Sequence, residues 1–390
     1  LLDTATGAVR PLTGNGDEAS FRWLDANTLI FPSCRTGDQP GKTAFYRLDI
    51  RGSEAERAFT IPLSVKQFHP LPDGRWFVLT RRPMTPPEDL PADQPQPGRD
   101  YTVFDELPFW ADGLGMINGT RMSGWIFDPA DGSVNQIPPP TYDMEGAAVS
   151  PEGSRILYWG VSFEGIRPDY RQLMLYDLAT GQTRSLVPDG KYRITQVGWW
   201  GTDIWFEGGD PHTSVSRSPK LYLLNPATGD CRTFCAPDGF LGTSAIGDMS
   251  LGGGKVCAVQ GDSLYAVRLQ RDVTALLRFD KAGNFAPVAS YEGIACFDII
   301  GENAYLAAFR DHRPQELYRQ PLSGGEPERL TQFHDAFLET RQISRPEHIT
   351  FRSRDGQEVD GWVIRPSGYE PGKKYPGVLN IHGGPKAAYG

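Results

Sequence analysis

One hairpin pattern recurs seven times between positions 1 and 333. Each copy has an apolar, often aromatic strand, a tight turn with glycine and a more polar second strand; the copies span residues 1–13, 45–59, 125–137, 173–186, 221–234, 276–288 and 317–330. Their turn glycines are Gly7, Gly52, Gly132, Gly181, Gly229, Gly283 and Gly324. Apart from the interval between Gly52 and Gly132, which is nearly twice as long, the spacing of these glycines is typical of four-stranded propeller blades.

A second hairpin pattern lies between the copies. It places a polar turn before an alternating or apolar run at residues 23–33, 71–80, 150–160, 199–209 and 299–309. Two hairpins make one blade, and a blade buries both faces only by stacking on its neighbours. We therefore expect an all-β, seven-bladed β-propeller at 1–333, with Trp23, Trp76, Trp199, Trp200 and Trp205 packed between blades.

The first blade is expected to be incomplete. Only its outer hairpin is visible, so its inner strands should lie upstream of Leu1. Since the chain opens on leucine and not methionine, the natural N-terminus is expected to lie further upstream, and a signal peptide is not excluded.

The long interval between Gly52 and Gly132 contains an insertion at 84–120. It begins with a stretch rich in proline and acidic residues, which is unsuited to a central strand, and continues to Phe109 and Trp110. Insertions in repeat proteins gather on one face, often the binding face, so these two aromatic residues are candidate substrate contacts. The alternative is that they pack back onto their own blade as a hydrophobic anchor.

Composition narrows the classes of partner and cofactor. The net charge is −9 with no run of basic residues, which argues against nucleic acid, and no segment has the roughly 20 apolar residues of a membrane helix. Five scattered cysteines favour a reduced, cytoplasmic protein over a disulfide framework. Cys231 and Cys235 have a C-x3-C spacing, but they fit a strand better than a metal site. We expect no metal and no cofactor.

The end of the chain carries a different pattern. The apolar run 378–381 suits a buried strand, and His382, Gly383, Gly384 and Pro385 follow it. With the turn at Ser353, Asp355 and Gly356, with Gly361-Trp362 and with Tyr375-Pro376, the segment 344–390 resembles the entry into the catalytic domain of the prolyl oligopeptidase family of serine peptidases, in its acylaminoacyl peptidase and dipeptidyl peptidase branches.

The resemblance implies a domain plan and a site. Residues 334–343 would be a linker, and 344–390 the opening strands of a truncated α/β hydrolase domain. His382, Gly383, Gly384 and Pro385 would form its oxyanion loop, with the backbone N–H of Gly384 as one donor. No G-x-S-x-G motif occurs, so the catalytic Ser, Asp and His are expected beyond Gly390, on a second polypeptide or a longer chain.

The expected function is a serine peptidase that hydrolyses short peptides through an acyl-enzyme, with the propeller restricting substrate size. A homo-oligomer is possible. Two alternatives stay open: a non-catalytic propeller that binds a partner, and an esterase with the same hydrolase fold. Glu145 and Glu164 are the propeller carboxylates considered for binding a substrate amine, although exposed carboxylates are often simply solvated.

Overall fold

The computed structural model describes residues 1–14, 16, 18, 20–52, 54–84, 103–215, 217–242, 245–247, 249–381, 383 and 388–389. Its contacts divide the chain into two compact units, which are treated separately. One unit comprises Leu1, Arg10–Thr213 and Leu224–Asp230. The other comprises Leu2–Val9, Ser214–Leu223 and Cys231–Gly390.

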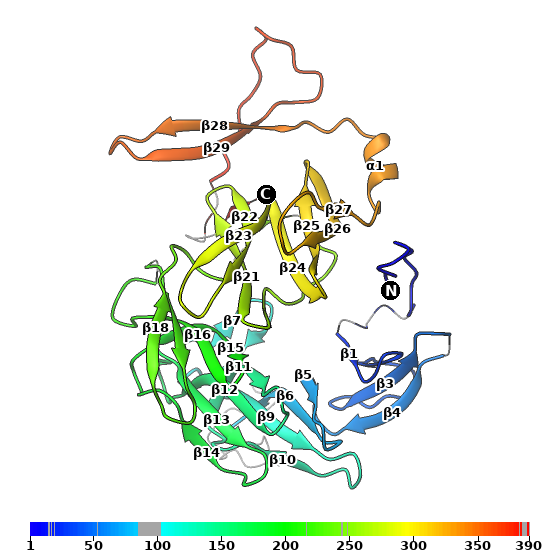
Figure 1. The fold of residues 1–390 in the computed structure, drawn as a ribbon, viewed down its shortest axis with the longest axis vertical. Coiled ribbons are helices and arrows are strands. Elements are labelled where there is room, and N and C mark those ends of the chain that lie inside the picture. Colours follow the sequence, from blue (N-terminus) through cyan, green and yellow to red (C-terminus); the bar gives the residue numbers. More distant parts are fainter. Residues whose placement is uncertain are drawn as a thin grey trace. The chain divides into compact units, whose positions relative to one another are not determined.

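The described residues contain six four-stranded antiparallel sheets (Figure 1). The first three sheets are β1 (Arg22–Trp23), β2 (Thr28–Pro32), β3 (Thr43–Asp49) and β4 (Glu56–Ile61); then β5 (Val65–Pro70), β6 (Trp76–Pro83), β9 (Thr120–Phe127) and β10 (Val134–Gln136); then β11 (Tyr142–Val149), β12 (Arg155–Ser162), β13 (Gln172–Asp177) and β14 (Thr183–Ser185). In each sheet, strands that follow one another in the chain also pair side by side, as in a propeller blade. The pairing of β6 with β9 spans the insertion.

Three further sheets repeat this order. They are β15 (Arg193–Trp200), β16 (Asp203–Gly209), β17 (Lys220–Leu224) and β18 (Cys231–Cys235); β20 (Cys257–Gln260), β21 (Ser263–Gln270), β22 (Val273–Phe279) and β23 (Phe285–Tyr291); and β24 (Gly293–Ile300), β25 (Asn303–Arg310), β26 (Arg313–Pro321) and β27 (Glu328–Arg329). A short parallel pair joins β19 (Ala245–Ile246) to β30 (Ala388–Tyr389).

The structure confirms six of the seven repeats as blade-like sheets. Their six turn glycines and Gly7 all have positive φ, between 68° and 125°, a region that glycine enters without steric cost. The first repeat forms only an isolated bridge between Leu2 and Val9 within the described residues, so a seventh blade is not confirmed.

Apolar residues from neighbouring sheets share their cores. Phe77 and Ile126 of the second sheet pack with Tyr142 and Tyr158 of the third, in one buried cluster. Trp76 lies in the cluster between the first and second sheets. The apolar face of each sheet must be covered by another layer, and the neighbouring sheet supplies that cover.

Four of the five predicted packing tryptophans are buried: Trp76, Trp199, Trp200 and Trp205. The prediction is wrong for Trp23, whose side chain is 46% exposed. It belongs to the two-residue strand β1, which is paired only with β2 and lies at the edge of its sheet. Among the described residues, no strand pairs on the outer side of β1 to shield the indole.

The C-terminal part begins with the helix α1 (Asp335–Glu339), inside the predicted linker. The strands β28 (Pro346–Arg352) and β29 (Glu358–Ile364) then form an antiparallel hairpin. Its turn uses the predicted residues, since the N–H of Gly356 bonds to the carbonyl of Ser353 at 3.0 Å. The predicted domain boundaries themselves stay predictions.

The prediction of a buried strand at residues 378–381 is wrong for this chain. No strand forms there, and Val378, Leu379 and Ile381 are 95%, 82% and 81% exposed. A strand requires a neighbour for its N–H and C=O groups, and no described strand lies alongside this run. The start of a hydrolase domain is therefore not confirmed. Among the described residues, no helix is long and apolar enough to cross a membrane.

Candidate functional site

The predicted oxyanion loop lies largely outside the described residues. His382, Gly384 and Pro385 are not described, and Gly383 is described and exposed. The oxyanion role therefore stays a prediction from the sequence. No cluster of three or more His, Cys, Asp or Glu able to hold a metal occurs in the described part of the chain. Of the pair with C-x3-C spacing, Cys231 is exposed and Cys235 is buried.

The insertion presents an aromatic surface. Phe104 and Phe109 stack with ring centroids 4.5 Å apart, and their side chains are 39% and 37% exposed. Trp110, 51% exposed, opens a small hairpin of β7 (Trp110–Ala111) and β8 (Gly115–Met116). We define the aromatic surface as Phe104, Phe109 and Trp110. The alternative that residues 107–110 pack into their own blade as an anchor does not fit these exposures.

Backbone contacts hold the insertion against the next blade. Leu107 makes a parallel bridge to Ile166, in the loop between β12 and β13. The N–H of Leu107 bonds to the carbonyl of Gly165 at 2.9 Å, and the N–H of Arg167 bonds to the carbonyl of Leu107 at 2.8 Å. The insertion is thus tied to two consecutive sheets, the one that it interrupts and the one that follows.

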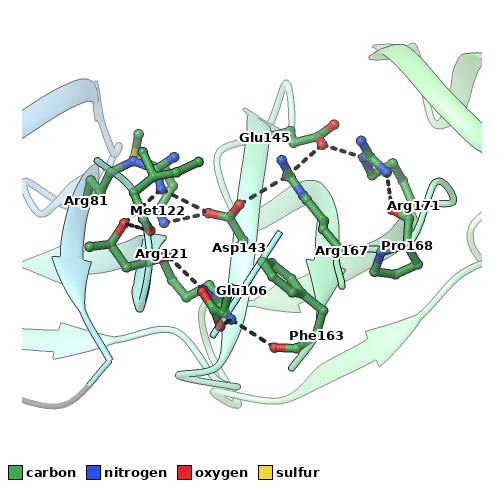
Figure 2. Close-up of polar contacts among 12 residues, drawn as sticks. Arg81, Glu106, Arg121, Met122, Asp143, Glu145, Phe163, Arg167, Pro168 and Arg171 are labelled. Carbon is green, nitrogen blue, oxygen red and sulfur yellow. Dashed lines mark hydrogen bonds and ion pairs between the residues drawn. The ribbon is translucent and has the colours of Figure 1, made fainter. Parts of the chain in front are cut away.

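A buried ion pair anchors the same segment (Figure 2). Arg121 of β9 meets Glu106 in a bidentate pair, Nη1 to Oε2 at 3.0 Å and Nη2 to Oε1 at 2.6 Å. The guanidinium also donates to the carbonyl of Phe163 at 2.8 Å and lies over the ring of that residue. Paired guanidinium and carboxylate groups of this geometry fix orientation as well as charge.

The ionisation of Glu106 follows from these contacts. Burial by itself raises the pKa of the carboxyl group, but hydrogen bonds from Arg121 and from the N–H of Gly119 outweigh it. The net result is a pKa below the ordinary glutamate value. Glu106 is therefore a carboxylate at neutral pH, as its pairing with Arg121 requires.

A second set of charges continues along the next blade (Figure 2). Asp143 accepts a hydrogen bond from the N–H of Met122 at 2.7 Å and forms an ion pair with Arg167 at 3.0 Å. Glu145 contacts Arg167 at 2.8 Å and also contacts Arg171. Each carboxylate here faces at least one guanidinium.

A β-bulge places Glu145 in this set. The register between β11 and β12 shifts between Met144 and Gly146, and a bulge re-aims the extra side chain. Glu145 is thus held by arginines rather than simply solvated. Glu164, the other carboxylate considered from the sequence, is exposed.

Sequence reasoning missed the arginines of this site. Arg121 stands in a strand whose neighbours Ser123 and Phe127 are buried, and a lone charge within such a strand is the signal that marks a paired, buried group. Its partner gives no comparable signal, because Glu106 lies in a loop.

Several known proteins are similar to this chain, although no protein-family model matches it. A peptidase of Bacillus subtilis, named as the uncharacterized peptidase YuxL, is 26% identical over 411 residues, covering 100% of this chain and 61% of the relative. The acylaminoacyl peptidase of Pyrococcus horikoshii has a TM-score of 0.71 at 20% identity, covering 96% of this chain and 54% of that one. An acylaminoacyl peptidase solved with Z-Gly-Gly-Phe-chloromethyl ketone has a TM-score of 0.72 at 18% identity, covering 100% and 56%.

The chain resembles peptidases of the prolyl oligopeptidase family in sequence and in fold. The sequence match to YuxL runs through both units, and the solved members share the fold. At 18 to 20% identity these structures support the fold and nothing finer. The chain spans 61% of YuxL and about half of the solved members. The activity of a whole family member is therefore a proposal for this chain.

Proposed function

We propose that this chain is the propeller and opening segment of a serine peptidase that hydrolyses short peptides. The observation that carries the proposal is the match to a named peptidase over the whole chain. This match includes both the blade-like sheets and the terminal segment. A solved member of the same fold was captured with a peptide chloromethyl ketone, which supports peptides as the ligand class.

In the proposed mechanism a serine outside this chain attacks the peptide carbonyl and forms an acyl-enzyme, which water then cleaves. A histidine oriented by an aspartate takes the proton of the serine. This chain contributes the oxyanion loop, where the N–H of Gly384 donates to the developing oxyanion. His382, Gly383 and Pro385 shape that loop.

The propeller is proposed to restrict substrates by size. Short peptides enter, whereas folded proteins are excluded, and the aromatic surface of the insertion contacts the peptide. The ion pair of Glu106 with Arg121 and the backbone bridge of Leu107 to the neighbouring loop hold that surface in place. The remainder of the hydrolase domain, on a second polypeptide or a longer chain, is the proposed protein partner. A cytoplasmic location stays a prediction.

The test is fluorophosphonate labelling of the preparation, followed by denaturing separation and intact mass of every species. Label on a polypeptide other than this one, or longer than 390 residues, supports the proposal. Hydrolysis of a peptide amide and of a short acyl ester then separates a peptidase from an esterase. If nothing is labelled, the proposal fails and a non-catalytic binding propeller, whose exposed aromatic surface would contact a partner, takes its place.

A further inference from the structure

Two arginines face each other on one side of the second sheet. Arg82 of β6 and Arg121 of β9 are register partners, so their side chains leave the same face directly opposite one another. Like charges in this position are mutually destabilising. Glu106 neutralises Arg121. Among the described residues, no carboxylate lies within ion-pair distance of Arg82, whose guanidinium lies over the ring of Trp125, 5.1 Å from its centroid.

A cavity of about 180 Å³ opens on this face. Strand alternation gathers its walls, because Ser123 and Trp125 follow Arg121 at alternate positions of β9, and Gln136 pairs opposite Trp125. The described lining consists of Arg82, Pro83, Met84, Arg121, Ser123, Trp125, Gln136 and Pro140. This described lining contains two guanidinium groups and no acidic side chain.

One buried hydrogen-bond donor in the described lining remains unused. The side chain of Arg121 is 2% exposed, and its Nε–H has no hydrogen-bond partner among the described residues. A buried donor without a partner carries a desolvation penalty, and a bound acceptor would remove it. Trp125 offers no such donor, since its indole N–H bonds to the hydroxyl of Ser123 at 2.9 Å. The buried, unused donor of the described lining is therefore cationic.

We propose that this cavity is a carboxylate-binding pocket, which takes an acidic side chain or the C-terminal carboxylate of a peptide. Arg82 would bind the carboxylate through its planar fork, held flat by Trp125. The volume is below the roughly 300 Å³ at which pockets for drug-sized ligands begin, so it suits a single side chain or terminus. The peptide as ligand rests on the proposed function, whereas the anion site rests on this geometry alone.

The test measures binding to the 390-residue chain by isothermal titration, so it requires no catalysis. Three N-acetylated peptides of one sequence are compared: one with a glutamate and a C-terminal amide, one with glutamine in its place and an amide, and one with that glutamine and a free C-terminal carboxylate. At least one of the two peptides with a carboxylate should bind about tenfold more tightly than the neutral peptide. Which of them does so identifies the source of the carboxylate.

Variants assign the effect to the pocket. Arg82→Gln should reduce the preference for a carboxylate to nearly none, and Arg82→Lys, which keeps the charge but loses the fork, should leave part of it. Arg47→Gln is the matched control, because Arg47 is an exposed arginine of the same unit whose ionic partner, Glu56, is 3.5 Å away and also exposed. This control should keep the full preference.

Equal affinity for all three peptides would overturn the proposal, as would a carboxylate preference that survives in Arg82→Gln. If Arg82→Gln does not fold, Arg82→Lys replaces it, and a carboxylate preference as strong as that of the unaltered chain would then overturn the proposal. A preparation that shows the carboxylate preference but takes no fluorophosphonate label would contradict the proposed function and leave the pocket supported.

Discussion

Arg121 and Glu106 form a bidentate ion pair between a strand and a preceding loop, with side chains 2% and 7% exposed. The pair fastens the insertion that carries the aromatic surface to the blade that it interrupts. Removing one partner leaves the other charge buried, and such a charge is expensive because water no longer solvates it.

Arg121→Met is therefore expected to lower the free energy of unfolding by about 3 to 5 kcal/mol. Urea unfolding followed by circular dichroism measures this. The double variant Arg121→Met with Glu106→Gln should recover part of the loss, because it leaves no unpaired charge. Arg51→Gln, which breaks an exposed pair with Asp49, is the control and should behave as the unaltered chain. Equal effects of Arg51→Gln and Arg121→Met would contradict the anchoring role.

A second prediction concerns pH. Glu316 is 1% exposed, and although burial raises the pKa of its carboxyl group, hydrogen bonds from Thr331 and from the N–H groups of Phe333 and His334 lower it below the ordinary value. A depressed folded-state pKa contributes stability that is complete above the ordinary glutamate pKa of about 4.3 and is lost as the pH falls through the folded-state value.

Glu316→Gln should therefore destabilise the protein at pH 7. The difference in stability between this variant and the unaltered chain should shrink as the pH falls below about 4. Unfolding midpoints between pH 7 and pH 3 measure the difference. A gap between the two proteins that stays constant over this range would refute the assignment.

The third prediction tests a turn. Gly283 has a φ of 96°, and a Cβ there would lie 1.8 Å from the carbonyl oxygen of Phe234. Gly132 occupies the same place in its own repeat, with a φ of 76° and nothing within 4 Å of such a Cβ. Gly132→Ala should lower stability by about 1 to 2 kcal/mol, because alanine is strained at a positive φ. Gly283→Ala should lower it clearly more, because the backbone at Phe234 must also move to make room for the Cβ. Equal losses would show that the contact with Phe234 relaxes freely.

The fourth prediction concerns the aromatic surface in the enzyme assembled with its hydrolase remainder. Phe109→Ala or Trp110→Ala should lower kcat/KM for peptides by about 3- to 10-fold, through lost contact area, while hydrolysis of a small ester stays the same. Thermal unfolding should change little, because both side chains are more than one third exposed. A parallel loss of peptide and ester hydrolysis would make the surface a structural element.

The fifth prediction tests the oxyanion loop in that same assembly. Gly384→Val should lower kcat by about 10²- to 10³-fold with a much smaller change in KM, because the donor matters most in the transition state. Steady-state kinetics on a peptide amide separates the two constants. A loss that falls on KM alone would remove Gly384 from the oxyanion role.

The hairpin repeats could be predicted from the sequence because the signals that form them are local. A turn glycine with positive φ and alternating apolar residues act within one hairpin, so Gly181 and Gly229 were placed correctly from the sequence. The exposure of Trp23 and of residues 378–381 could not be predicted from the sequence. Composition marks these residues as suitable for burial, but burial requires a neighbouring layer, and none of the described elements supplies it.

The sequence by itself determined that the chain is a series of strand meanders and where their turns fall, since spacing and side-chain alternation fix which segments pair in each hairpin. Only the tertiary structure decided that Glu106 folds back onto Arg121, that a bulge aims Glu145 at Arg167, and that Arg82 is left with a cavity in front of it. These relationships join side chains through the path of an insertion and the register of neighbouring strands. Neither is encoded in any short stretch of residues, because each depends on how separate elements pack.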